Sequence, residues 1–539
     1  MPRITMSLAS LLSLLFYLGA PTRNCLPPHG AAATAPQLGQ VNFPTSCSAD
    51  AQPSVEMGVA LLHSFQYQQA DQTFSEAAKR DSKCAMAYWG KAMSHYEQLW
   101  EFPSGKALKL GAQDIQRAQT LGAPTERERT YIAAAGAFYL ADAKLSETQR
   151  IQALSAALAG LHKQSPDDVN AAAFYALSLL ALADQQEVDA PANRKAAIAI
   201  LDPLCRRAPN NPGPAHYLIH ATDTAEFAAQ GLEAARAYSK IAPDSSHALH
   251  MPSHIFVRLG LWQDSISSNI VAAASAAKAT QEHRSAPHYQ FHALDFLNYS
   301  YLQSGQESKA REMVKELESV SGADRESIAE HQAWFAARNV FELHRWKEAA
   351  ELPIPHVPRE SQESTYKVRA IGAAHLGDAA AARQNLQKFV EISTEEQRKE
   401  HHHGDKATDK SVRQLEAEAW VAFAEGKRED AVKTLRSAAE REDADGVDSL
   451  AMPAREMLAD MLLELKLPAE ALAEYKAALK NSPNRFDSLY GAGHAAQLAG
   501  DSAAANAYFT KLTEICAPAA DRAELGEAKT YLTRASKGK

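Results

Sequence analysis

The segments AEALAEYKAALKNSP (residues 469–483) and SAAANAYFTKLTEIC (residues 502–516) decide the fold of this chain. At an offset of 34 residues, small and large apolar positions match: Ala471 with Ala505, Tyr475 with Phe509 and Ala478 with Leu512. Apolar residues spaced three or four apart lie on one face of a helix. Each segment therefore predicts a helix that buries one face, and the offset predicts a repeat.

The same spacing recurs through most of the chain. Its small and apolar positions are Gly58, Ala70, Phe74 and Ala77, then Ala197, Leu201, Pro209 and Pro243, then Gly305, Ala310, Gly377, Ala382, Gly426 and Ala431. This pattern resembles the tetratricopeptide repeat, a helix pair of about 34 residues with small residues where the helices touch. The resemblance implies an all-α solenoid of about ten hairpins, running over 51–392 and 412–539. It also implies that the first helix of each pair lines a concave groove, which binds a protein or peptide.

Composition supports helix and argues against nucleic-acid binding. The 539 residues are rich in Ala, Leu, Glu, Lys, Gln and Arg, which favour helix. The formal charge is -9, and no concentrated run of Lys and Arg predicts a basic face. We expect neither a nucleic-acid partner nor a membrane-embedded domain.

The N-terminus is typical of an export signal. Met1-Pro2-Arg3 supplies a positive start, 4–20 is mostly apolar, and small residues at 31–33 suit cleavage. We predict a signal peptide at 1–33, an N-terminal extension at 34–50 and a periplasmic or secreted protein; the alternative is an uncleaved anchor. Cys25 lacks a lipoprotein context, so no lipid anchor is predicted.

Cys47 and Cys84 are expected to form a disulfide. Cys47 precedes the first predicted helix and Cys84 precedes the third, so both fall at the same end of an antiparallel hairpin. Export would make the bond chemically reasonable. The alternative is two separate thiols.

The stretch 209–297 contains an unusual set of histidines with aspartates nearby. Its members are His216, His220, Asp223, His247, His250, His254, His288, His292 and Asp295. Three His-x-x-x-His spacings place ring pairs one helical turn apart, which suits chelation of a transition metal such as zinc or copper. Pro252, between His250 and His254, predicts that one helix is kinked or begins there.

The tetratricopeptide resemblance places these residues on neighbouring first helices, facing the groove. Three interpretations stay open: one or two metal ions, a polar groove for a peptide or small anion, or internal hydrogen bonding. As to function, we expect an exported binding or scaffold protein with a metal site in its groove. The alternative is a metalloenzyme, a hydrolase or an oxidase, in which Asp223 or Asp295 acts as ligand or base.

Other candidates are less specific. The resemblance places Trp89, His331, Trp334 and Arg338 in the groove; for Trp89 an aromatic core is the alternative. The stretch 393–411 contains His401, His402 and His403 among charged residues with no apolar period, which predicts a charged linker. No nucleotide-binding loop, haem-attachment motif or hydrolase nucleophile motif is present, so an enzyme is not the first expectation.

Overall fold

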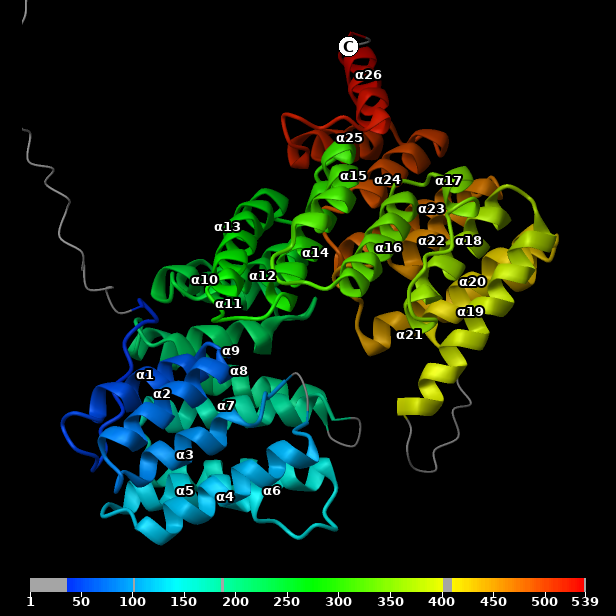
Figure 1. Cartoon of the computed structure of the whole chain (residues 1–539). Helices are drawn as coiled ribbons and strands as arrows, with labels where there is room; N and C mark the ends of the chain where they lie inside the picture. The colour runs from blue at the N-terminus through cyan, green and yellow to red at the C-terminus, as the bar shows by residue number, and fades with distance from the viewer. Residues whose placement is uncertain (1–35, 100–101, 186–188, 401–409, 538–539) are drawn as a thin grey trace, which may run out of the picture. The chain divides into compact units, whose positions relative to one another are not determined.

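A computed structural model describes residues 36–99, 102–185, 189–400 and 410–537, with the side chains of 396–400 left out. The predicted signal peptide therefore lies outside the described residues, as do His401, His402 and His403. Residues 37–539 form one contact-defined unit. All the regular structure within the described residues is helical, which confirms the predicted fold class (Figure 1).

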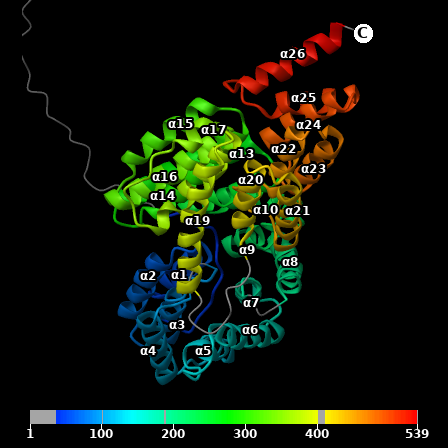
Figure 2. The same cartoon turned by 90° about the vertical axis from the view of Figure 1, so that its right-hand side faces the viewer.

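Successive helices pack as antiparallel pairs (Figures 1 and 2). The first half contains α1 Gln52–His63, α2 Tyr67–Arg80, α3 Ala85–Ser94, α4 Gly105–Leu121, α5 Glu126–Tyr139, α6 Glu147–Gln164, α7 Val169–Ala183, α8 Ala190–Arg207, α9 Pro212–Thr222, α10 Ala228–Ile241, α11 Ser246–His250, α12 Pro252–Arg258 and α13 Trp262–Gln281. The second half contains α14 His288–Gln303, α15 Glu307–Glu316, α16 Arg325–Glu342, α17 Trp346–Ala350, α18 Glu363–His375, α19 Ala379–Glu400, α20 Val412–Ala424, α21 Arg428–Asp445, α22 Ala454–Glu464, α23 Pro468–Asn481, α24 Phe486–Leu498, α25 Ser502–Ile515 and α26 Ala523–Lys537, with short 3-10 turns at η1 Leu317–Ser319 and η2 Glu360–Gln362.

The repeated small residues lie where paired helices touch. A Cβ atom at Gly58 would come within 2.6 Å of the Phe74 ring, and one at Gly90 within 2.3 Å of the same ring. Gly493 has the same relation to Phe509 near the other end of the chain. A small residue is therefore required at this position because an aromatic ring of the neighbouring helix packs against it.

In many pairs the turn between the two helices contains a residue with positive φ, a conformation that glycine adopts without strain. Gly305, Gly377 and Gly426 have this conformation, as the repeat pattern predicts. In three pairs a larger residue occupies the same turn: Phe65, His344 and Lys466. Those pairs carry no glycine signal at the turn, and the pairs at Phe65 and Lys466 are predicted from the small and apolar residues of their helices instead.

One helix end differs from the predicted one, and one helix break agrees with its prediction. Helix α19 continues through Glu400, so the first part of the predicted linker 393–411 is helical rather than irregular. Helix α11 ends at His250 and α12 begins at Pro252, as the proline predicts.

The N-terminal extension packs along the first five helix pairs in an extended conformation. Its backbone accepts or donates hydrogen bonds at Gln37, Gln40, Asn42 and Pro44, with Asp244, Asn210, Asn170 and Arg127 as the respective partners. Phe43 is fully buried and stacks on Trp89 at a centroid distance of 5.3 Å. The cysteines at its end and before α3, Cys47 and Cys84, form the predicted disulfide.

A buried ion network connects the middle of the chain to its C-terminal helices. Arg485 is fully buried, and its guanidinium lies 2.8 Å from a Glu342 oxygen and 2.7 Å from a Glu456 oxygen. The Trp262 indole N–H also donates to the Asn484 carbonyl at 2.8 Å. These contacts hold the start of α24 against α13, α16 and α22.

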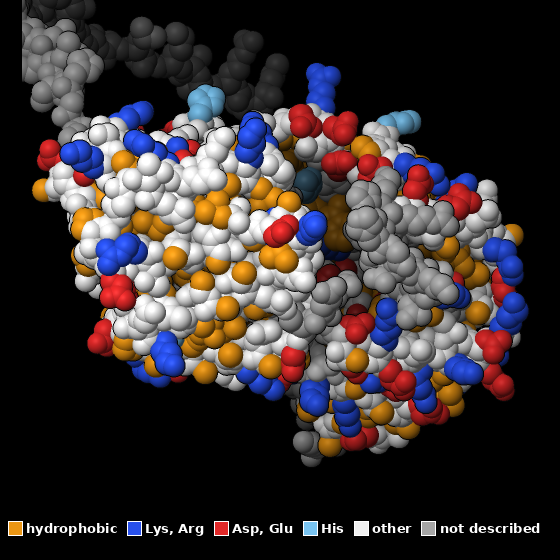
Figure 3. Space-filling view, turned by 90° about the horizontal axis from the view of Figure 1, so that it is seen from below, with side chains coloured by type: hydrophobic (Ala, Val, Ile, Leu, Met, Phe, Trp, Pro, Cys, Tyr) orange, Lys and Arg blue, Asp and Glu red, His pale blue; other side chains and the backbone are white. Residues whose placement is uncertain are grey.

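No helix among the described residues has both the length and the apolar character needed to cross a bilayer. On the face shown in Figure 3, Lys and Arg side chains are interspersed with Asp and Glu.

Candidate metal centre

The histidines come from three neighbouring parts of the fold. Helix α9 carries His216 and His220, α11 carries His247 and His250, α12 carries His254, and α14 carries His288 and His292. Helix α9 packs against α12, and α11 packs against α14. The rings therefore meet across helices as well as along them.

The first triad consists of His216, His220 and His247. The Nε2 atom of His216 lies 2.9 Å from that of His247 and 3.1 Å from that of His220. His216 is fully buried, and Phe65 packs against all three rings, with centroid distances of 4.4 to 5.7 Å.

The second triad consists of His250, His254 and His292. The Nε2 atoms of His250 and His254 are 3.1 Å apart, so the pair meets despite the helix break at Pro252. The His292 ring lies 4.4 Å from that of His250 and 5.7 Å from that of His254, between centroids. In each triad the candidate ligand atoms all lie within 4.8 Å of one another.

The two triads are neighbours. The rings of His220 and His254, one from each triad, have centroids 6.4 Å apart. Phe296 packs under the second triad, with its ring 4.9 Å from that of His250. Six of the seven predicted histidines thus come together, but as two groups of three rather than as three pairs.

Hydrogen bonds fix which ring nitrogen faces the centre of each triad. The Nδ1–H of His216 donates to the His63 carbonyl at 2.6 Å, since that oxygen can only accept. The Nδ1–H of His250 donates to the Asn269 amide oxygen at 2.7 Å, and the Asn269 amide nitrogen donates in turn to the Ser265 carbonyl. In a neutral imidazole with hydrogen on Nδ1, Nε2 carries a lone pair. His216 and His250 therefore present lone pairs to their triads.

Asp223 orients a third ligand candidate. The Nδ1–H of His254 donates to Asp223 at 2.8 Å, and Arg258 donates to the other carboxylate oxygen at 2.9 Å. Burial alone would raise the pKa of Asp223, but these two partners outweigh it and lower the pKa well below its usual range. A carboxylate behind a histidine is the usual outer partner of a metal ligand.

Burial keeps His216, His220, His247 and His250 uncharged. It lowers the pKa of His216, His247 and His250 well below the ordinary value, with a further contribution from the neighbouring imidazoles. It lowers the pKa of His220 to about 3. At neutral pH these side chains are neutral, which is the form that binds metal.

Two predicted ligands lie apart from the triads. The Asp295 carboxylate accepts hydrogen bonds from Trp334 at 3.0 Å and from Arg338 at 2.7 Å, and these partners turn it away from the histidines. The ring of His288 packs on Tyr289, with centroids 4.0 Å apart, and His288 belongs to neither triad. The prediction that Asp223 is itself a ligand is also modified, because its oxygens contact His254 and Arg258.

The predicted groove residues divide into two kinds. Trp89 does not face a groove: it is 1% exposed and packs against Phe43 and Tyr131, because the N-terminal extension covers it. Arg338 is also largely buried. His331 and Trp334 do line a cavity, and Trp334 is 39% exposed.

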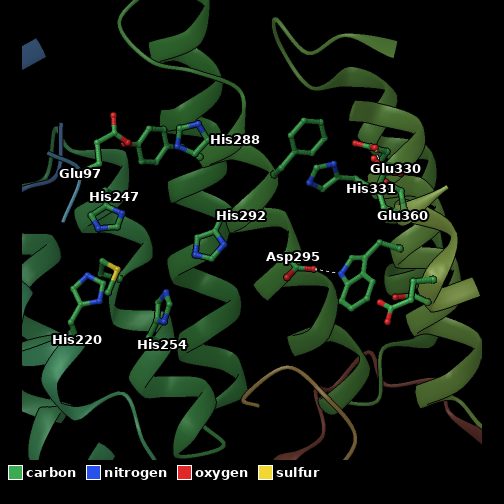
Figure 4. A pocket seen from close by; sticks show the side chains of 17 residues that line it. Glu97, His220, His247, His254, His288, His292, Asp295, Glu330, His331 and Glu360 are labelled. Atoms are coloured by element: carbon green, nitrogen blue, oxygen red, sulfur yellow. Dashed lines mark hydrogen bonds between the residues drawn. The ribbon is translucent and has the colours of Figure 1, made fainter. Parts of the chain in front are cut away.

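That cavity lies directly in front of both triads. Its volume is about 720 Å³, and its lining includes His220 and His247 from the first triad and His254 and His292 from the second. Figure 4 shows these four histidines along one side of the space, with Glu330, His331 and Glu360 across from them. The histidines therefore line one side of a cavity that is partly open to solvent.

Several residues that complete the site carry no signal in the sequence. The carbonyl of His63 and the amide of Asn269 orient ligand candidates, while Phe65 covers the first triad. A histidine spacing predicts pairs within a helix, but it carries no information about a carbonyl or an amide on another helix.

One other group of potential ligands does not fit a metal. His344, Glu456 and Asp487 lie close together in the C-terminal part. However, Glu456 pairs with Arg485, and Asp487 makes two hydrogen bonds to Arg522. Arginine already neutralises both carboxylates.

Comparison with known proteins gives a likeness in fold alone. No family model and no curated protein matches the sequence. Among solved structures, the chain is similar to a tetratricopeptide repeat protein from Parabacteroides merdae ATCC 43184, with 16% identity and a TM-score of 0.30. The similarity covers 53% of this chain and 97% of that one.

Proposed function

We propose that this chain is a helical-repeat metalloprotein that binds two transition-metal ions, one in each histidine triad. His216, His220 and His247 would hold the first ion. His250, His254 and His292 would hold the second, with Asp223 orienting His254 from behind.

The observation that carries the proposal is the approach of His250 to His254. Both rings donate their Nδ1–H outward, to Asn269 and Asp223, so their Nε2 lone pairs face each other at 3.1 Å. In the neutral rings, two lone pairs at that distance repel unless a proton or a metal ion lies between them. Bonds of about 2.05 Å to a tetrahedral metal would put such nitrogens roughly 3.3 Å apart, close to the observed separation.

The ligand set favours zinc or copper. Neutral imidazole suits zinc, copper, nickel and iron, whereas magnesium and calcium prefer oxygen. Both triads offer nitrogen alone. Zinc and copper are therefore the ions to try first.

The cavity favours a catalytic role over a purely structural one. Structural sites are closed by four protein ligands, while catalytic sites keep an open position. Each triad provides three nitrogens, and two histidines of each face the cavity. Two adjacent metal ions there could together activate water or dioxygen, which supports a hydrolase or an oxidase.

A scaffold role is the second candidate. A further cavity of about 280 Å³ shares Trp334 and Ser364 with the first, so together they offer a long surface for a peptide. Panning a peptide library against metal-free protein, followed by the same selection on Trp334→Ala, tests this candidate. Enrichment that depends on Trp334 would favour it.

Metal content tests the main proposal. Protein purified without a His tag and loaded with zinc should retain two equivalents of zinc per chain after dialysis, as measured by elemental mass spectrometry. His250→Gln and His216→Gln should each lose about one equivalent. His288→Gln is the matched control, since His288 lies at the same cavity outside the triads, and it should retain both.

The same samples separate open from closed coordination. In protein loaded with cobalt(II), azide should change the visible spectrum when an open position faces the cavity. Retention of less than half an equivalent of metal by native protein, or equal loss in His288→Gln, would refute the metal proposal.

We also propose that the protein is exported. The Cys47–Cys84 disulfide supports this, because disulfides persist in oxidising compartments. Sequencing the N-terminus of the protein recovered from the periplasm or the medium of a bacterial host would test both export and cleavage near residue 33.

A further inference from the structure

Apart from the histidines, the ionisable side chains that line the cavity in front of the triads are mostly acidic. Five carboxylates line it: Glu97, Asp295, Glu330, Glu360 and Glu363. No Lys or Arg is among the described residues that line it. Asp295 and Glu363 are neutralised from behind by Arg338 and Arg413, at 2.7 and 2.9 Å.

Of the other three carboxylates, Glu97 lies on the histidine side, near His247 and His288 (Figure 4), and Glu330 and Glu360 lie across the cavity from the triads. Within the described part of the chain neither Glu330 nor Glu360 makes an ion pair, and Glu330 accepts a hydrogen bond from the neutral Ser361 hydroxyl at 2.7 Å. A ligand that spans the space would meet the imidazoles at one end and Glu330 and Glu360 at the other.

The walls between these ends are aromatic and held in place. The ring of Phe291 stacks on His331 with centroids 3.8 Å apart. Trp334 is fixed by its hydrogen bond to Asp295, and Arg338 covers one face of its ring at 4.9 Å. The Tyr289 hydroxyl donates to the Phe65 carbonyl at 3.1 Å. Fixed rings around a cavity of this size favour a flat apolar ligand.

We propose that the cavity binds a small aromatic molecule carrying a protonated amine. The ring would lie among Phe291, Trp334 and Tyr289, and the ammonium group would face Glu330 and Glu360. An oxygen at the opposite end of the molecule would then reach the triads. The orientation rests on the proposed metal sites, whereas the preference for a cationic aromatic molecule does not.

Three probes with one ring and one chain length test the charge preference: tyramine, tyrosol and 3-(4-hydroxyphenyl)propionate, which are cationic, neutral and anionic at neutral pH. Calorimetric titration of metal-free protein should give tyramine at least a tenfold lower Kd than the propionate, with tyrosol between them. In Glu330→Gln/Glu360→Gln the ratio should fall below threefold. Glu351→Gln, an exposed glutamate outside the cavity, should leave the ratio unchanged.

Zinc loading tests the orientation separately. Tyramine should bind at least tenfold more tightly to the loaded protein, whereas phenethylamine, which lacks the phenol oxygen, should gain less than twofold. If zinc is not retained but metal-free protein prefers tyramine, the metal proposal fails and the charge preference stands. Equal affinity for tyramine and the propionate, no measurable binding of any probe, or an unchanged ratio in the double variant would overturn the inference.

Discussion

Acidifying the metal-free protein should destabilise it between pH 6.5 and pH 4. Burial lowers the pKa of His63 from 6.5 to about 4, and that of His220 to about 3. Unfolding exposes both rings and restores pKa values near 6.5, so the unfolded chain binds more protons below that pH. The stability these neutral rings contribute is complete above pH 6.5 and is lost as the pH falls toward their folded-state pKa values.

The size of the loss follows from the two shifts. One pKa unit corresponds to about 1.4 kcal/mol. Between pH 6.5 and pH 5 each ring should cost about 2 kcal/mol of unfolding free energy, or about 4 kcal/mol for the pair. His63 is fully buried between Tyr217 and Asn170, so its protonated form would carry a charge away from water and would require the Tyr217 hydroxyl to accept rather than donate.

Urea unfolding at pH 7 and pH 5, followed by circular dichroism in the presence of a chelator, measures this loss. His63→Gln/His220→Gln replaces both rings by polar side chains that do not titrate, and its loss should be smaller by about 4 kcal/mol. His494→Gln, at an exposed position, is the control. A native protein that loses under 1 kcal/mol, or a double variant that loses as much as the native protein, would refute the reasoning.

Three further predictions follow from contacts described above. Reducing the Cys47–Cys84 disulfide, which spans a sequence separation of 37, should lower the unfolding free energy by about 4 kcal/mol on the chain-entropy model, measured by urea titration with and without reductant; an unchanged midpoint would contradict it. Arg485→Met should cost about 3–5 kcal/mol because it leaves Glu342 and Glu456 buried without a partner, and adding Glu342→Gln and Glu456→Gln should recover much of that loss in thermal melts. Asp223→Asn should weaken zinc binding by roughly 10- to 100-fold in competition with a chromogenic chelator, while Asp264→Asn, on the first turn of α13, should not.

The sequence predicts the fold class and the repeat well, because both depend on local rules. Gly58 and Phe74 carry the signal of one helix touching another, and the same relation returns at Gly493 and Phe509. Where Phe65 or His344 takes the turn conformation in place of glycine, the turn itself carries no signal, and only the residues within the helices can predict the hairpin.

The sequence predicts which histidines belong to the candidate site, but not how they divide into two triads. The spacing within a helix predicts that His216 and His220 converge, and they do. It does not predict that His247 joins them while its neighbour His250 faces the other triad, since that depends on how α11 lies between α9 and α14. The prediction that Trp89 lines the groove is wrong for a related reason. Periodicity identifies the face of the helix that points inward, but it does not reveal that the distant N-terminal extension covers that face.

The N-terminal extension has a mechanical consequence for the metal centre. In a simple stack of hairpins each unit contacts only its neighbours, so bending accumulates along the row. Here the extended N-terminal segment is hydrogen-bonded to successive hairpins, from Arg127 to Asp244. The last of these partners, Asp244, lies three residues before His247. Helices α9 and α11 are thus braced against sliding past each other, which restrains the distance between His216 and His220 on one helix and His247 on the other.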